Sequence, residues 1–465
     1  MSVALTNGVN YSLKPTSVKA TRKQVLIPSS NKTSFSPEET CIFYLPSLRN
    51  HVMDGQSGYL RLTLTVGAGA GYLDNCGQAL IQRIQTYGSG GQLISDIDQY
   101  NVLATMLTDL QLSQSEKIGL SSTLGAEDVY GTVGTVGVVA DDAALGSKVL
   151  FDAGFTATST VTDSNRRGMA LAAGSYTLCI PLLHPLFSLS EKMWPAFAMA
   201  DDTRVEITWS SVINSTVQVG GTGITWTLSN PEILVDYIEF DSGVFPLIQQ
   251  TYAGRDLIIP SQDYRTYSSQ IASGTTGSIS QIIPCKVMSA RAFFFAFRPA
   301  ESQVAAGYAS SGRTNPFYSA QDNFRLNIGG VAYPQKPITT RVAGNFAEYF
   351  ASTQTALHAF NNLSMNGALN RSYYNVSGSD TGHQNAANSY RNAFALAINV
   401  DTLRGQSETS NSGLSLANLT TYYEGYIGTS NKATGGGDEA VSVSTFVLHD
   451  VMFIVDASGN ISLRF

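Results

Sequence analysis

VLIP (25–28) and LIIP (257–260) open two segments of this chain that repeat a single pattern. The first segment continues with three apolar stretches: IFYLP (42–46), YLRLTLTV (59–66) and LIQRIQTYGSGGQLI (80–94). The second continues with their counterparts: ISQIIP (279–284), RAFFFAF (291–297) and FRLNIGGV (324–331). The order is the same in both segments, at offsets of 232 residues for VLIP/LIIP and 239 residues for the Gly-Gly pairs. The sequence therefore predicts two copies of one β-rich domain.

Each copy also contains the signals of paired strands followed by a helix. In Tyr59–Val66, leucine and valine alternate with arginine and threonine, which is typical of a strand with one buried face. Glycine at Gly90-Gly91 allows a tight turn between the next two strands. A helix is expected from about Asp98, capped by Asp96 or Asp98, and its counterpart from about Val342. Their apolar faces are Tyr100, Leu103, Ala104, Leu107 and Leu110 in the first, and Val342, Phe346, Tyr349, Phe350, Leu357 and Phe360 in the second.

A long polar segment follows each expected helix, at residues 114–170 and 361–390, and both are predicted to be loops. The run GTVGTVG (131–137) within the first lacks the GK[ST] ending of a phosphate loop. Further strands are expected at 176–181, 205–209, 224–228 and 233–240, and at 394–398, 421–427, 445–455 and 461–465. Eight antiparallel strands in two packed sheets form a jelly roll. The predicted fold class is all-β, with two tandem eight-stranded antiparallel jelly rolls and short helical insertions.

These expectations divide the chain into a basic arm (1–23), a first jelly roll (24–245) and a second jelly roll (246–465), with a bridge at 241–256. Residues 1–37 contain no acidic residue and carry a charge of +5. The whole chain has a net charge of −7, so residues 38–465 carry −12. Such an arm is attracted to a nucleic acid, to anionic lipid or to an acidic neighbouring surface. With so few charges, no sequence-specific nucleic-acid binding is expected.

Composition favours a protein that assembles. Only 14% of the 465 residues are charged, and 43% are hydrophobic. A surface this poor in charge is expected to be buried against other subunits, which predicts a stable oligomer. A secreted β protein would have a similar composition, but residues 1–17 lack the apolar core of a signal peptide. No apolar run approaches the ~20 residues of a membrane span.

Two further stretches carry a family resemblance, namely IQRIQTYGSGGQLISDIDQYNVLATML (81–107) and CIPLLHPLFSLSEKMWPAF (179–197), the latter followed by VEITW (205–209) and EILVDYIEF (232–240). With the tandem jelly rolls, they resemble the double jelly-roll major capsid proteins of adenoviruses, tailless phages, virophages and polinton-like viruses. The resemblance implies pseudo-hexameric trimers that tile an icosahedral shell around DNA, and no catalytic residues. It also implies contacts with neighbouring capsomers and with penton and minor capsid proteins, and a place in the virion after assembly in the host cytoplasm or nucleus.

No catalytic, cofactor-binding or metal site is predicted from the residues themselves, and the expected protein is not an enzyme. The four cysteines, Cys41, Cys76, Cys179 and Cys285, show no metal-ligand spacing and are expected to be free thiols. His184 and Trp194 lie in an apolar, proline-rich segment and are expected to pack rather than to bind a ligand. Asp241-Ser-Gly243 and Asp380-Thr-Gly382 match the paired loops of aspartic proteases, but two turns explain them better.

A different class of protein shares these features. A β-rich fibre or adhesin that binds a receptor or a glycan through its loops has the same strand content and the same low charge. Such a protein would be isolated as single spikes, whereas a capsid protein forms shells or hexagonal arrays. Electron microscopy of the purified protein separates the two interpretations.

Overall fold

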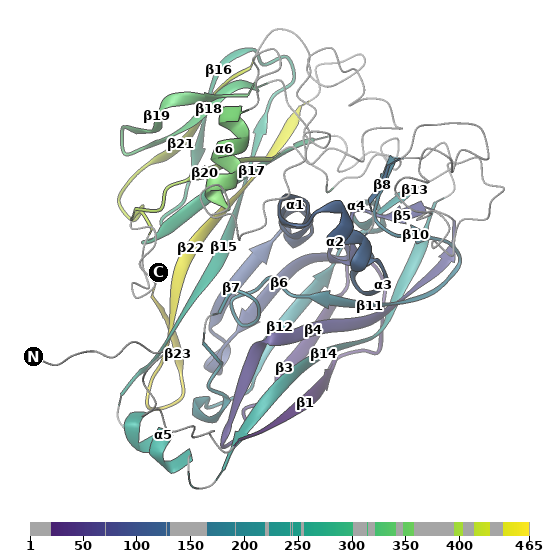
Figure 1. The fold of residues 1–465 in the computed structure, drawn as a ribbon, viewed down its shortest axis with the longest axis vertical. Coiled ribbons are helices and arrows are strands. Elements are labelled where there is room, and N and C mark those ends of the chain that lie inside the picture. Colours follow the sequence, from purple (N-terminus) through teal and green to yellow (C-terminus); the bar gives the residue numbers. More distant parts are fainter. Residues whose placement is uncertain are drawn as a thin grey trace, which may run out of the picture.

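The structure is a computed structural model of the chain. It describes residues 20–464 except for 70, 127, 131–164, 191, 219–222, 242, 244, 253–254, 301–313, 315–320, 341–346, 358–394, 403–412 and 428–439. Two β-sandwiches follow each other along the chain, and they lie side by side with their strands diverging upward (Figure 1).

The first sandwich pairs two four-stranded antiparallel layers. One layer has the order β1 (Ala20–Pro28), β14 (Thr225–Phe240), β4 (His51–Ala68), β11 (Gly174–Pro181). The other has the order β3 (Thr40–Leu45), β12 (Thr203–Trp209), β6 (Ile81–Tyr87), β7 (Leu93–Asp98). A two-residue strand, β2 (Ser34–Phe35), adds to β14. Leu60, Leu62, Leu64 and Val66 of β4 are all buried, so the alternation predicted from the sequence is confirmed.

The second sandwich repeats this arrangement. One layer has the order β15 (Leu257–Ile271), β22 (Val441–Val455), β17 (Ala290–Pro299), β20 (Ala395–Asn399), with β23 (Ile461–Arg464) added to β22. The other has the order β16 (Gly277–Ile283), β21 (Thr421–Ile427), β18 (Gln321–Ile328), β19 (Val331–Thr339). Each sandwich has eight main strands, if β2 and β23 are left aside. Counted in chain order, the first, eighth, third and sixth form one sheet, and the second, seventh, fourth and fifth form the other. This is the strand order of a jelly roll.

The internal repeat is therefore confirmed at the level of topology. VLIP lies on β1 and LIIP on β15, which are the first strands of the two sandwiches. Gly90 and Gly91 separate the fourth and fifth strands of the first copy, and Gly329 and Gly330 do so in the second. All four have positive φ, between 59° and 87°, a conformation that favours glycine in both turns.

A helix follows the fifth strand in each copy, as predicted: α1 (Tyr100–Gln111) and α6 (Ala347–Ala356). The predicted cap of α1 is wrong. The N-cap is Gln99, in the left-handed conformation and without a side-chain cap hydrogen bond, whereas the Asp96 carboxylate pairs with Arg83 and Asp98 lies one residue before the cap. In α6, Tyr349 is buried and Phe350 and Leu357 are partly buried, whereas Val342, Phe346 and Phe360 lie outside the described residues.

The segment 114–170 is more ordered than expected where it is described. It contains α2 (Gln114–Gly119), α3 (Ser121–Leu124) and the antiparallel pair β8 (Asp128–Tyr130) and β9 (Asn165–Arg167). Next to them lies a small sheet, formed by β10 (Ala170–Leu171), β5 (Gly71–Leu73) and β13 (Thr216–Gln218), with α4 (Val212–Ser215) before β13. The segment 361–390 lies outside the described residues.

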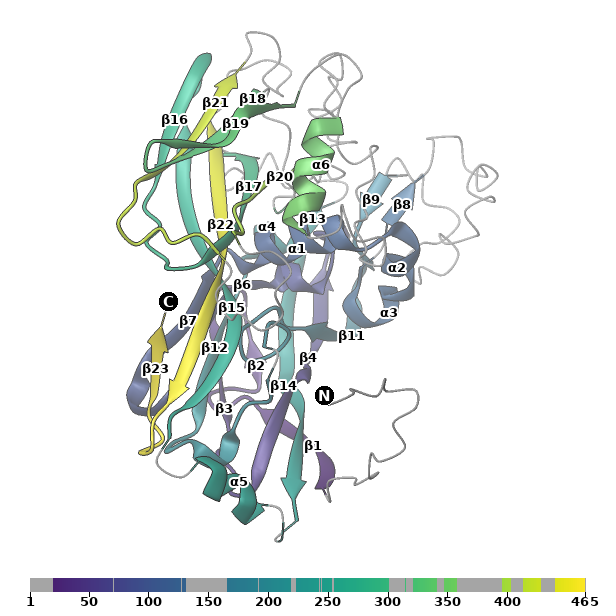
Figure 2. The same cartoon turned by 60° about the vertical axis from the view of Figure 1, so that its left-hand side comes forward.

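A helix that the sequence did not predict, α5 (Phe245–Tyr252), connects β14 to β15 at the lower end of the molecule (Figure 2). The proposed boundary between residues 245 and 246 falls in this connection and stays a prediction. Ala20 to Lys23, assigned from the sequence to the basic arm, belong to β1, where Arg22 pairs with Asp236 and Lys23 with Glu239. Residues 1–19 lie outside the described residues. One continuous apolar cluster runs through both sandwiches, so the two jelly rolls pack as a unit.

Candidate functional site

The junction between the two jelly rolls contains a group of polar contacts, two of whose members, Ser95 and Asp263, are buried. Strand β7 of the first jelly roll faces β15 of the second. The Ser95 hydroxyl donates to Oδ1 of Asp263 over 3.1 Å, and the Thr266 hydroxyl donates to the Asp98 carbonyl over 2.8 Å. Leu93, Ser95, Asp263 and Arg265 line a cavity of about 340 Å³ at this junction.

Gln99 connects three strands of the second jelly roll to the start of α1. Its amide donates to the Ser268 hydroxyl over 2.8 Å. Its carbonyl oxygen accepts from Nη2 of Arg298 at 3.0 Å and from the Ser444 hydroxyl at 2.5 Å. Because the amide fills both its donor and its acceptor roles across the junction, Gln99 fixes the relative position of the two sandwiches.

Asp263 titrates far from its ordinary range. Burial raises the pKa of this carboxyl to about 7, although hydrogen bonds from the Tyr264 N–H and Ser95 and the charge of Arg265 oppose the shift. His449 is its cross-strand partner, and burial lowers the pKa of that imidazole to about 4. Both groups are therefore neutral between about pH 4 and pH 7, where the carboxyl keeps its proton and the imidazole has lost its second one.

The apolar segment 181–197 fills the lower part of this junction. Trp194 forms a two-bond bridge with Met53 and meets Phe453 edge-on, with ring centroids 5.7 Å apart. The Ser261 hydroxyl of β15 donates to the Pro185 carbonyl over 3.0 Å. Segment 181–197 therefore belongs to the first jelly roll and holds the second against it.

His184 packs within the same segment, as expected from the sequence. It is fully buried, and its Nδ1 accepts from the Leu186 N–H, so Nε2 carries the proton and donates to Thr86 over 2.9 Å. Burial lowers the pKa of this imidazole to about 3. A neutral, doubly hydrogen-bonded histidine has a structural role here.

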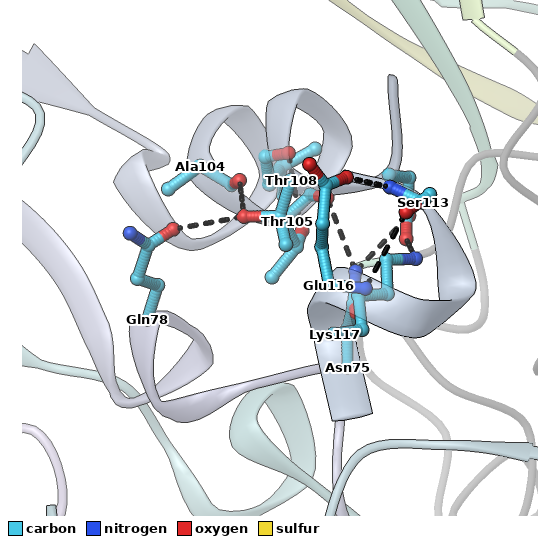
Figure 3. Close-up of polar contacts among 10 residues, drawn as sticks. Asn75, Gln78, Ala104, Thr105, Thr108, Ser113, Glu116 and Lys117 are labelled. Atoms are coloured by element: carbon cyan, nitrogen blue, oxygen red, sulfur yellow. Dashed lines mark hydrogen bonds and ion pairs between the residues drawn. The ribbon is translucent and has the colours of Figure 1, made fainter. Parts of the chain in front are cut away.

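A second buried polar cluster joins α1 to α2 (Figure 3). Nζ of Lys117 lies 2.6 Å from Oδ1 of Asp109, and both side chains are 1% exposed. The Asn75 amide donates to Oδ2 of Asp109 over 3.0 Å. Ser113 and Glu116 form a capping box at the start of α2, because each binds the backbone N–H of the other. The buried pair of Lys117 and Asp109 holds α2 on α1, whereas Ser113 and Glu116 lie at the surface.

The described part of the chain does not bring the residues considered as protease or metal-binding groups together into a site. Asp241 is exposed at the end of β14, and the Asp380 motif of the protease alternative lies outside the described residues. Within the described ranges, no three His, Cys, Asp or Glu side chains gather as metal ligands, and no helix could span a membrane. The four cysteines are free thiols; Cys41, Cys76 and Cys285 are buried and Cys179 is partly exposed.

Sequence reasoning missed Gln99, Asp263 and Lys117. Each lies in a polar stretch, DIDQY, PSQDY or QSEKIG, that has the composition of an exposed surface. The one available signal was the Ser-x-x-Glu spacing of Ser113 and Glu116, which marks the start of a helix.

No family model matches the sequence, and no curated protein matches it. Solved structures do match the fold. A chain of the PBCV-1 virus capsid is 10% identical with a TM-score of 0.57, covering 97% of this chain and 98% of its own. The Faustovirus major capsid protein is 11% identical with a TM-score of 0.55, over 97% and 92%. This chain has the double jelly-roll fold of viral major capsid proteins. The mavirus major capsid protein shares this double jelly roll at 11% identity, with a TM-score of 0.51 over 100% and 92%.

Proposed function

We propose that this chain is the major capsid protein of an icosahedral DNA virus, a structural subunit that acts as a homotrimer. The observation that carries the proposal is the pair of complete jelly rolls, locked side by side through Gln99 and segment 181–197. Two jelly rolls per chain give six per trimer, so a threefold assembly has the pseudo-hexagonal outline that tiles a plane. The double jelly-roll fold, shared with capsid proteins along nearly the whole chain, supports the same role.

The partners follow from that role. The trimer would contact neighbouring capsomers, penton proteins and minor capsid proteins in the virion, after assembly in the host cytoplasm or nucleus. Residues 1–19 carry Lys14 and Lys19 and no acid, so they would meet an inner membrane or the genome without base recognition.

Electron microscopy and light scattering of the purified protein test the proposal. A trimer mass in mild buffer, with shells or hexagonal arrays at high concentration, is the expected result. Isolated fibres would favour the fibre or adhesin alternative. A monomer at micromolar concentration would contradict the capsid role.

A further inference from the structure

Three chemically complementary side chains meet in the buried cluster that joins α1 to α2 (Figure 3). Lys117 belongs to α2 and Asp109 to α1. Asn75 lies between β5 and a short 3-10 helix at Gly77–Leu80. All three residues are 1% exposed. An amine, a carboxyl group and a carboxamide therefore share one site that is closed to solvent.

The carboxyl group of Asp109 connects the other two side chains. Its Oδ1 lies 2.6 Å from Nζ of Lys117, and its Oδ2 accepts from Nδ2 of Asn75 at 3.0 Å. Because the two nitrogens contact the two oxygens of one carboxyl group, the amine and the carboxamide are neighbours. A carboxyl group in this position can take a proton from one nitrogen and give a proton to the other.

The carboxamide of Asn75 is held in a fixed position. Its Nδ2 also donates to the Thr105 carbonyl over 3.1 Å, and its backbone adopts a φ of 79°, in the left-handed region that asparagine tolerates. Its Oδ1 is buried and accepts no hydrogen bond from the described residues. A buried carbonyl oxygen without a donor raises the free energy of the amide, and such groups often mark reactive positions.

We propose that Lys117 and Asn75 form an intramolecular isopeptide bond, with Asp109 transferring the protons. Nζ of Lys117 attacks Cγ of Asn75, the Cγ–Nδ2 bond breaks, and Nδ2 leaves as ammonia. The lysine ammonium starts with three protons on Nζ, and the new amide nitrogen keeps one of them. Asp109 relays one of the two released protons to Nδ2 and keeps the other. Atoms and charge balance, so the reaction requires no second reactant.

The surroundings favour this reaction over the unreacted pair. A buried ammonium and a buried carboxylate both carry a desolvation cost, and the reaction leaves neither charge behind. The fold holds the nucleophile beside the electrophile, which removes much of the entropic barrier. The closed site also excludes the water that would compete with the amine. The ion pair of Lys117 and Asp109 and the crosslink are therefore two states of one site.

The crosslink would close residues 75–117 into a covalent loop that contains β6, β7 and α1. A covalent closure of this kind stabilises a fold mainly by restricting the unfolded chain, as a disulfide does. The four cysteines are free thiols and supply no such constraint. Since α2 is the first element of segment 114–170, the bond would anchor that segment to the first jelly roll. The inference goes beyond the proposed function, because it requires only a single folded chain.

Mass spectrometry of the purified, folded wild type tests the proposal. We expect an intact mass that is lower than the sequence mass by one molecule of ammonia. Trypsin should no longer cleave after Lys117, and one branched peptide should join residues 62–83 to residues 84–148. Fragmentation of that peptide then places the bond between Asn75 and Lys117.

Three variants separate the roles of the side chains. Lys117→Arg keeps the positive charge but lacks the nucleophilic amine, and Asn75→Ala lacks the electrophile, so both should have their full sequence mass. Lys192→Arg alters an exposed lysine outside the cluster. This matched control should lose ammonia as the wild type does. Circular dichroism checks the fold of each variant.

Other outcomes would overturn the assignment. A folded wild type with its full sequence mass would show that the site remains an ion pair. Ammonia is also lost when an Asn-Gly sequence, such as Asn7-Gly8 or Asn366-Gly367, forms a succinimide. A loss that maps to those peptides and persists in Lys117→Arg would contradict the crosslink. Loss of water, with Lys117 bonded to Asp109, would show that Asn75 is not the acceptor. The capsid role stands or falls separately, on the oligomer that light scattering measures.

Discussion

Asp263 shows how one buried carboxyl ties the stability of the junction to pH. Its pKa rises from 3.8 in an exposed chain to about 7 in the fold. Between these values the unfolded chain has released the proton and the folded chain has kept it. The contribution of Asp263 to the free energy of unfolding is therefore largest below about pH 4. It falls as the pH rises to about 7 and is constant above that pH. The loss amounts to about 4 kcal/mol.

Asp263→Asn removes this dependence. The amide oxygen still accepts from Ser95 and the Tyr264 N–H, and no charge forms at high pH. We expect the free energy of unfolding of the variant, relative to the wild type, to grow as the pH is raised from 4 to 8. Urea unfolding at a series of pH values measures it. The exposed Asp201→Asn serves as a control, and parallel pH profiles for wild type and Asp263→Asn would show that Asp263 is not a buried acid.

Lys117 and Asp109 form a fully buried ion pair, in which removing one partner strands the other charge. Lys117→Met should cost about 3–5 kcal/mol of unfolding free energy. The double variant Lys117→Met/Asp109→Leu should recover much of that loss, because no charge then remains buried. Thermal and urea unfolding of both single variants and the double variant measure the difference. A double variant as unstable as the sum of its parts would mean that the cluster does more than hold α2 in place.

At this scale the sequence predicts little of the junction. The buried roles of Gln99 and Asp263 depend on partners that lie 168 or more residues away in the chain. A local pattern does not contain such a pairing, and an aspartate in a polar stretch resembles a surface residue. Trp194 and His184 were placed correctly as packing residues because the apolar, proline-rich segment around them is itself a local signal.

At the scale of elements, the strands and the glycine turns were predictable because both are local. Alternation in Tyr59–Val66 and positive φ at the Gly-Gly pairs need no knowledge of the rest of the chain. Helix α5 and the antiparallel pair β8 and β9 were missed, since proline and glycine near them mark loops. The cap of α1 was misassigned because Arg83, from a neighbouring strand, pairs with the Asp96 carboxylate, and the N-cap falls at Gln99, one residue after Asp98.

Segment 181–197 is one of the elements that join the jelly rolls, and its Trp194 meets Phe453 of the second one. Trp194→Ala should lower the free energy of unfolding by about 3–5 kcal/mol, because a cavity replaces the indole. A double-mutant cycle with Phe453→Leu should give a coupling energy of about 0.5–1.5 kcal/mol for the edge-on ring pair. Urea unfolding of the four proteins supplies the cycle. Additive losses would show that the rings do not interact.

At the scale of the molecule, the repeat is the feature that sequence and structure share most fully. Each apolar stretch of the first copy has a counterpart on the equivalent strand of the second. The relative placement of the copies could not be predicted, because it depends on side-chain contacts such as those of Gln99.

Residues 1–19 supply the last prediction, which concerns the shell that the proposed function implies. Deleting residues 2–19 removes Lys14 and Lys19 but keeps Arg22 and Lys23, whose ion pairs with Asp236 and Glu239 hold β1 on β14. The sheet is then intact, so trimers should form as in the wild type.

Shell assembly should be impaired by this deletion, and more so at low salt, where the contacts of the basic arm with an anionic interior are strongest. Electron microscopy of assembly reactions over a range of ionic strength measures the yield of closed shells. Neutralising the arm alone, with Lys14→Gln and Lys19→Gln, separates its charge from its length. Normal shells from the deleted protein, together with cleavage of the wild-type arm by trypsin in closed shells, would place the arm outside and contradict the prediction.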